Sequence, residues 1–134
     1  MSSEPTAISD AAVVRELYAA RARNDLTSAA ELLAPDVIWH EPYDYLGTLS
    51  GRDSVMDAIR QSMEETRGTF SLVVTDLLSS NDHVVALVDF SAERHGGRMS
   101  GREIGVFKVD RGLIREVWFY TAEDPDAVSE FMRG

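Results

Sequence analysis

The sequence predicts an α+β fold in which a curved antiparallel sheet wraps around about three N-terminal helices, followed by a short C-terminal helix. Three observations predict this fold. The first half of the chain holds segments with helical spacing of apolar residues, and the second half holds four long segments rich in β-branched and aromatic residues. Short turn sequences separate those four segments, which is typical of antiparallel strands in a meander.

Helical periodicity and capping residues predict four helices. The expected helices cover residues 9–23, 27–34, 52–66 and 125–132. Thr27 is expected to cap the second helix, and Pro35 to end it, because a proline disfavours helical geometry in the residue before it. Residues 1–7 are polar and contain Pro5, so we expect them to form a flexible tail.

Five strands are expected. A short strand at 37–39 ends at Glu41-Pro42, and a loop over 42–51 follows, with room for a brief strand at 46–49. The four long strands cover residues 70–78, 83–93, 99–109 and 113–121. The concave side of such a sheet, closed by helices, forms a cone whose mouth admits a small ligand.

Composition limits the class of protein. The length predicts a single domain over residues 1–134, and 44% hydrophobic with 27% charged residues is typical of a soluble protein. No apolar run approaches the ~20 residues of a membrane span, and no signal-peptide pattern is present, so we expect a cytoplasmic protein without a membrane partner. The absence of cysteine excludes thiolate chemistry, and a net charge of −10 disfavours nucleic acid as a partner.

The order of these elements and several local motifs resemble the NTF2-like superfamily, in particular its SnoaL-like and ketosteroid-isomerase-like branch. The resemblance spans nearly the whole chain, from residues 13–26 onward. The other motifs are APDVIWHEP at 34–42, GRDSV at 51–55, DHVVAL at 82–87, GVFKV at 105–109 and IREVW at 114–118. The superfamily contains isomerases, cyclases, epoxide hydrolases and non-catalytic adaptors, so the resemblance implies the fold and leaves the activity open.

The resemblance implies one catalytic residue, whereas this sequence lacks the family's residues at other catalytic positions. In ketosteroid isomerases the general base is the acidic residue before a proline at the end of the first strand, which here is Glu41. The tyrosine and protonated aspartic acid of that family's oxyanion hole fall by register on Leu17 and Gly105. A shift of one residue turns a helical side chain by ~100°, so Tyr18 is expected to be a poor substitute.

Two further catalytic positions of the superfamily are also unfilled. The acid–base aspartate of SnoaL-type cyclases follows a tryptophan on the last strand, and here Phe119 follows Trp118. The last member of the Asp-Arg-Asp set of the epoxide hydrolases is not found. True ketosteroid isomerase activity is therefore not expected.

Strand alternation predicts a pair of pocket carboxylates. Glu41 shares its side of the strand with Trp39, and Glu103 shares its side with Phe107, so both glutamates can face the interior of the cone. An apolar pocket raises the pKa of a carboxyl group, and two nearby carboxylates raise one of the two further. One glutamate can then act as a base and the other as an acid.

An alternative places Glu41 at a solvent-facing strand end and pairs Glu103 with Arg102 or Arg94.

Aromatic and apolar side chains complete the expected ligand site. Tyr43 and Tyr45 can donate hydrogen bonds at the mouth or simply pack. The expected ligand-binding residues are Leu17, Tyr18, Trp39, Tyr43, Tyr45, Phe107 and Phe119. The three histidines lack helical ligand spacing, so no metal is expected.

The resulting hypothesis is an enzyme that transfers protons without a cofactor on an apolar carbonyl or polyketide-like molecule, as an isomerase or cyclase. The alternatives are a non-catalytic ligand-binding or adaptor domain and an epoxide hydrolase. Trp118 and Tyr120 fall on the outer face of the sheet, where the resemblance implies a homodimer. Alternatively, the C-terminal helix covers this face through Val128, Phe131 and Met132.

Overall fold

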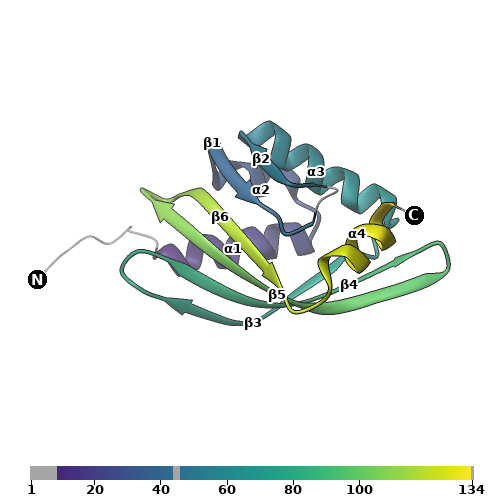
Figure 1. Cartoon of the computed structure of the whole chain (residues 1–134). Helices are drawn as coiled ribbons and strands as arrows, with labels where there is room; N and C mark the ends of the chain where they lie inside the picture. The colour runs from purple at the N-terminus through teal and green to yellow at the C-terminus, as the bar shows by residue number, and fades with distance from the viewer. Residues whose placement is uncertain (1–8, 44–45, 134) are drawn as a thin grey trace, which may run out of the picture.

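Four helices and six strands make up the protein, seen here in a computed structural model that describes residues 9–43 and 46–133 (Figure 1). The expected tail at 1–7 lies outside the described residues. In chain order the elements are α1 (Asp10–Ala22), α2 (Leu26–Glu31), β1 (Leu33–His40), β2 (Thr48–Ser50), α3 (Arg52–Glu65), β3 (Ser71–Ser79), β4 (Val84–Arg94), β5 (Gly97–Asp110), β6 (Leu113–Thr121) and α4 (Pro125–Arg133).

The strands form one sheet in the order β2-β1-β6-β5-β4-β3. Strands β3 to β6 are antiparallel neighbours, as the short turns predict, and β1 joins the sheet by parallel pairing with β6. The sheet curves around α1. Helix α3 runs along the top of the view, and α4 lies at the right, near the C-terminal end of α3 (Figure 1). The predicted α+β fold, a curved sheet wrapped around N-terminal helices, is confirmed.

Helix α1 lies inside the curve of the sheet and is buried over a wide arc. Ser9 caps it by accepting a hydrogen bond from the Ala12 N–H. Five of its side chains are buried, and the helix contacts the strands β3 to β6 as well as α2. Because strands surround so much of the helix, adjacent positions such as Leu17 and Tyr18 are both in the interior.

The boundary between α2 and β1 differs from the prediction. Asp25, and not Thr27, caps α2 by accepting a 3.1 Å hydrogen bond from the Ser28 N–H. The helix ends at Glu31 and β1 already begins at Leu33, which pairs with Ile114 of β6. Pro35 therefore lies in a strand, at a register shift where the missing N–H breaks no regular ladder.

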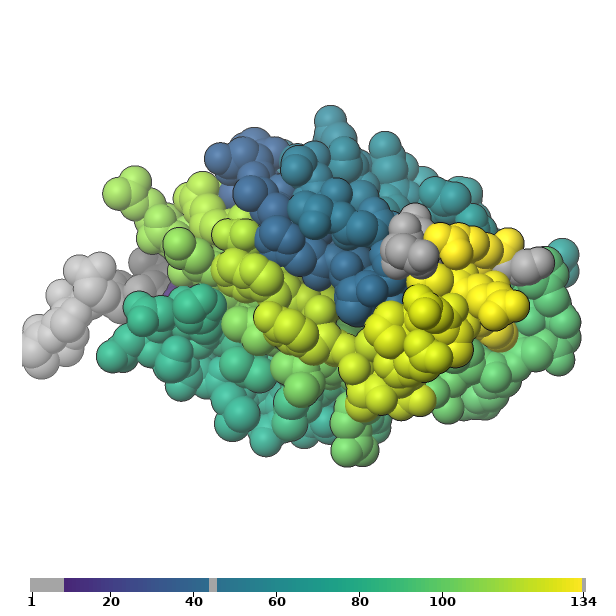
Figure 2. Space-filling view, viewed as in Figure 1, coloured from purple at the N-terminus to yellow at the C-terminus, as the bar shows by residue number. Residues whose placement is uncertain are grey.

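The outer face of the sheet is not covered by α4. The large apolar side chains that remain exposed among the described residues all lie on this face: Val73, Leu78, Ile104 and Tyr120. Val128 of α4 packs instead with Tyr43 and Phe90, on the inner side. Figure 2 shows α4 at one end of the molecule, with β6 open at the surface. The expectation that the C-terminal helix could cover Trp118 and Tyr120 is wrong.

Polar contacts also lie on this outer face. His40 stacks on Trp118 with ring centroids 5.6 Å apart, and its Nε2 lies 2.7 Å from Glu116 Oε2. Asp89 accepts a 3.2 Å hydrogen bond from Arg102 Nε on this face, and its side chain is 48% exposed. Among the described residues, no helix combines the length and the apolar character that crossing a bilayer requires.

Candidate functional site

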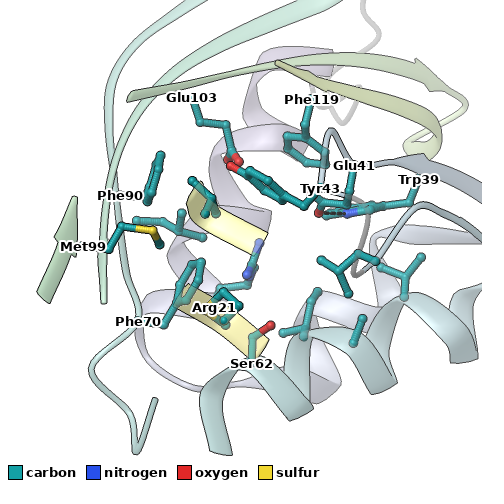
Figure 3. A pocket seen from close by; sticks show the side chains of 17 residues that line it. Arg21, Trp39, Glu41, Tyr43, Ser62, Phe70, Phe90, Met99, Glu103 and Phe119 are labelled. Carbon is teal, nitrogen blue, oxygen red and sulfur yellow. Dashed lines mark hydrogen bonds between the residues drawn. The ribbon is translucent and has the colours of Figure 1, made fainter. Parts of the chain in front are cut away.

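A cavity lies at the open end of the cone, between α1, α3, the inner face of the sheet and α4 (Figure 3). Its volume is about 50 Å³, which is room for a few water molecules. Most of its lining is apolar, and five aromatic side chains contribute: Trp39, Tyr43, Phe70, Phe90 and Phe119. The charged side chains in the lining are Arg21, Glu41 and Glu103.

Glu41 follows the last residue of β1, and a turn holds it in place. Its N–H donates to the Gly47 carbonyl at 3.1 Å, and the Gly47 N–H donates to the Tyr43 carbonyl at 2.8 Å. The indole Nε1–H of Trp39 donates to Glu41 Oε2 at 2.6 Å. Burial raises the pKa of Glu41 to about 7, although the bond from Trp39 and the charge of Arg21 act against this rise. Glu41 thus lines the cavity, and the residue is half-buried.

Glu103 enters the cavity from β5, where it pairs across the sheet with Val88. Only 8% of the residue is exposed. Burial raises its pKa to about 8, the nearby charge of Glu41 adds to the rise, and Arg21 opposes it. The ion pairs considered for Glu103 do not form, because Arg102 pairs with Asp89 and Arg94 pairs with Glu65.

The sheet register thus brings both predicted carboxylates to one cavity. Figure 3 shows Glu41 and Glu103 pointing into it from neighbouring parts of the wall, with the ring of Tyr43 directed toward Glu103. Two carboxyl groups that interact in an apolar site do not ionise together at neutral pH. Such a pair can hold one ionised base and one protonated acid at the same time, which is the requirement for general acid–base chemistry.

Sequence reasoning missed Arg21. Its side chain lines the cavity, and its guanidinium points into the cavity from α1 (Figure 3). Burial lowers its pKa, and the nearby Tyr18, Glu103 and Glu41 counteract this effect, so the group remains a cation at any physiological pH. A usable signal was present: Arg21 lies three residues after Tyr18, a spacing that puts both side chains on one face of the helix.

Tyr18, one position after Leu17, is buried in the core. It is 4% exposed, its ring packs edge-on against Phe107, and its hydroxyl lies 3.3 Å from the place a Cβ atom on Gly105 would occupy. Within the described part of the chain, no hydrogen-bond partner reaches this hydroxyl. Burial and the charge of Glu103 raise its pKa, so Tyr18 is a neutral phenol whose hydrogen is available as a donor.

The remaining predicted residues divide into two groups. Trp39, Tyr43 and Phe119 line the cavity, and the rings of Trp39 and Phe119 lie 4.9 Å apart. Leu17, Tyr18 and Phe107 are outside the lining and form the core beneath it. Tyr45 lies outside the described residues. Across residues 9–43 and 46–133, no three His, Asp or Glu side chains gather as a metal site.

Comparison with known proteins identifies relatives along most of the chain. Residues 14–117 match the SnoaL-like domain. The uncharacterized protein Rv0034 of Mycobacterium tuberculosis is 31% identical over 125 residues, which cover 91% of this chain and 95% of that protein. The structure of Bal32a, from a soil-derived mobile gene cassette, is 30% identical with a TM-score of 0.84, covering 90% of this chain and 94% of Bal32a.

More distant structures share the same architecture. An NTF2-like protein of unknown function from Burkholderia pseudomallei is 25% identical with a TM-score of 0.77, covering 91% of this chain and 95% of that one. TerC, co-crystallized with polyporic acid, has a TM-score of 0.77 at 16% identity, covering 91% and 96%. The last likeness concerns the fold alone. The fold is that of the NTF2-like cone, and the chain belongs to the SnoaL-like domain family.

Proposed function

We propose that this protein catalyses cofactor-free proton transfer on a small, largely apolar carbonyl compound. The observation that carries this proposal is the presence of Glu41 and Glu103 in one apolar cavity, with the pKa of each raised toward or above neutrality. A base is most effective when its pKa lies near the operating pH. TerC, which has the same fold, has been co-crystallized with polyporic acid.

Glu41 is the better base of the two. Its pKa is the lower one, and the Trp39 indole N–H stabilises its ionised form. In the proposed step, Glu41 takes a proton from the carbon next to the substrate carbonyl, and the C–H electron pair forms the C=C bond of an enol. Protonated Glu103 gives its proton to the carbonyl oxygen, so that no free enolate charge develops in the apolar cavity.

The enol then returns to a carbonyl by one of two routes. Protonation by Glu41 at a conjugated carbon, with return of the enol O–H proton to Glu103, gives an isomer. Attack of the enol carbon on a second carbonyl of the same molecule gives a ring. The enol O–H proton returns to Glu103 as the first carbonyl re-forms, and Glu41 gives its proton to the new alkoxide. Both routes regenerate the enzyme without an added reductant or oxidant.

A substrate needs more space than the cavity holds in this conformation. Val128 and Met132 of α4 form part of its wall. α4 packs through a short stripe of buried residues, and Arg94 donates a hydrogen bond to the Met132 carbonyl. We therefore expect displacement of α4 to widen the site at the lowest cost in free energy, since it breaks no strand pairing.

We also propose that the outer face of the sheet forms a homodimer. Exposed Ile104 and Tyr120 are direct neighbours on adjacent strands, and Trp118 lies next to them on the same face. Apolar and aromatic side chains gathered on a sheet face in this way are typical of protein interfaces. The SnoaL-like resemblance implies the same assembly.

Catalysis is tested with two simple carbonyl compounds, so that the natural substrate need not be known. Exchange of the α-hydrogens of cyclohex-2-enone and 2-tetralone with D₂O is followed by proton NMR, with wild-type protein, Glu41→Gln, Glu103→Gln and the surface control Asp89→Asn. We expect wild type and Asp89→Asn to accelerate exchange, and Glu41→Gln to lower the rate at least ~100-fold. Equal rates for wild type and Glu41→Gln would reject the proposal in favour of a non-catalytic binding domain.

A further inference from the structure

The guanidinium of Arg21 is a cation in the cavity, and no carboxylate among the described residues forms an ion pair with it. It points into the space that Glu41 and Glu103 also face (Figure 3). Among residues 9–43 and 46–133, neither a hydrogen bond nor an ion pair within 4.0 Å engages its side chain, in contrast to Arg94 and Arg102. Arg21 thus differs from arginines whose charge serves a fixed contact within the fold.

The two glutamates are not natural partners for Arg21. One oxygen of Glu41 already accepts the short bond from Trp39, and burial favours the protonated form of both glutamates. A protonated carboxyl group carries no charge and offers an arginine a weaker bond. A guanidinium that is partly withdrawn from water costs free energy unless an anion pairs with it. Glu103 and Glu41 offset part of this cost through their charge, and an anion on a ligand would supply a direct pair.

We propose that Arg21 binds a carboxylate group of the substrate, so that the pocket accepts a carbonyl compound with an acidic group at one end and an apolar body. The planar fork of N–H donors in arginine matches the two oxygens of a carboxylate, and the apolar lining at Phe70, Phe90 and Met99 can contact an apolar body. This inference rests on the proposed function for the reaction, and its binding part is tested separately from turnover.

A structural role for Arg21 is the competing explanation. Arg21 is in the last turn of α1, where a cation stabilises the helix dipole, and its charge also offsets that of the two glutamates. In that case the guanidinium would have no preference for a charged ligand over a neutral one of the same shape. A pair of matched ligands therefore separates the two explanations.

The experiment compares benzoate with benzamide, which share size and shape and differ in charge. Binding at about pH 6.5 is measured by NMR from the methyl shifts of Ile59 and Val128, both in the cavity lining. The variants are Arg21→Met, which keeps much of the volume, and Arg21→Lys, which keeps the charge. Arg23→Met is the matched control, because Arg23 follows the same helix and its side chain is 48% exposed.

We expect wild type and Arg23→Met to bind benzoate about tenfold more tightly than benzamide, since an added charged hydrogen bond is typically of this size. Arg21→Met should remove the preference, and Arg21→Lys should restore part of it. Equal affinities in wild type, no saturable benzoate binding, or an unchanged preference in folded Arg21→Met would each overturn the proposal. α-Hydrogen exchange and the preference for benzoate are separate readouts on the same wild-type protein, so a failure of the catalytic proposal and a failure of this one give different results.

Discussion

The indole Nε1–H of Trp39 donates a hydrogen bond of 2.6 Å to Oε2 of Glu41, the residue two positions later. Strand geometry sets this contact, because residues i and i+2 point to the same face. The bond favours the ionised carboxylate, whereas the surrounding apolar walls favour the protonated one. The balance keeps the pKa of Glu41 near neutrality, where a general base is most useful.

Removal of this bond should raise the pKa of Glu41. In Trp39→Phe the ring remains but the donor is lost, so we expect the pKa to rise by about one unit. Titration of ¹³C-labelled glutamate by NMR measures the change, with Glu41→Gln for assignment. Trp118→Phe is the matched control, because Trp118 is on the outer face and stacks on His40. A Glu41 pKa that is the same in Trp39→Phe and in wild type would show that the bond has no such role.

Stability should fall as the pH rises from about 5 to 9. The unfolded chain releases the protons of Glu41 and Glu103 near pH 4.5, whereas the folded protein retains them to about pH 7 and 8. Within that window the folded state binds more protons than the unfolded state, so raising the pH favours unfolding. We expect the free energy of unfolding, from urea titrations, to fall by a few kcal/mol across the window.

Glu103→Gln should weaken this pH dependence. An uncharged amide in the place of Glu103, which is 8% exposed, should raise the free energy of unfolding at pH 8.5 by about 1–3 kcal/mol, as it removes a buried ionised group. The same substitution should slow α-hydrogen exchange. Asp89→Asn, on the outer face, serves as the control in urea titrations. A slope as steep as that of wild type would exclude Glu103 as a source of the effect.

Benzoate binding should weaken over the same pH range. Below pH 7 the protonated glutamates leave Arg21 as the net charge of the cavity, whereas above pH 8 two carboxylates outweigh it. The other titratable groups near Arg21 are the phenols of Tyr18 and Tyr43, and Tyr18 stays neutral because its pKa is raised. We expect the Kd of benzoate to rise at least tenfold from pH 6 to 9, with the Kd of benzamide unchanged. A pH-independent benzoate Kd would contradict this charge balance.

Gly105 should not tolerate a side chain. A Cβ atom there would lie 2.7 Å from Phe107 Cε1 and 3.1 Å from Phe119 Cε1. We expect Gly105→Ala to destabilise the fold by about 1–3 kcal/mol in thermal unfolding, because a Cβ atom this close forces the fully buried ring of Phe107 to shift. Gly97→Ala is the control on the same strand, since its Cβ would make ordinary contacts of 3.5 Å or more. Equal losses in the two variants would show that the rings yield.

A charge on the outer face should dissociate the proposed homodimer. Tyr120→Glu places a carboxylate where the side chain is 55% exposed in one chain and buried in the dimer we propose. Light scattering after size exclusion should then report a monomer, and Thr27→Glu, which adds the same charge to the exposed side of α2, should remain dimeric. A wild-type protein that is monomeric at high micromolar concentration would reject the interface.

Local signals predicted most of the fold, and long-range contacts account for the differences. The strands β3 to β6 follow from alternation and turn residues that are close in sequence. The start of β1 at Leu33 depends on its pairing with Ile114, which no local pattern reveals. Local propensity favours a helix up to Pro35, and the sheet overrides that preference.

The candidate site was predictable in the same degree. Glu41 and Glu103 followed from strand alternation, because a two-residue period fixes the face once one member is placed. Arg21 did not, since a charged residue near the end of a helix usually faces water. The burial of Tyr18 beside Leu17 did not follow either, since α1 is enclosed on several sides and neighbouring positions are both buried.

The parallel pairing of β1 with β6 has a consequence for how the protein acquires its chemistry during folding. The contact between His40 and Glu116 joins positions 76 residues apart, whereas each hairpin among β3 to β6 closes over a few residues. Closure of the longer loop carries the larger entropic cost, so β1 is expected to dock after the hairpins have formed. Until that step Glu41 is hydrated and an ordinary acid. A partly folded chain would therefore contain the β3 to β6 sheet without a base of raised pKa. The protein becomes competent for proton transfer only when β1 docks.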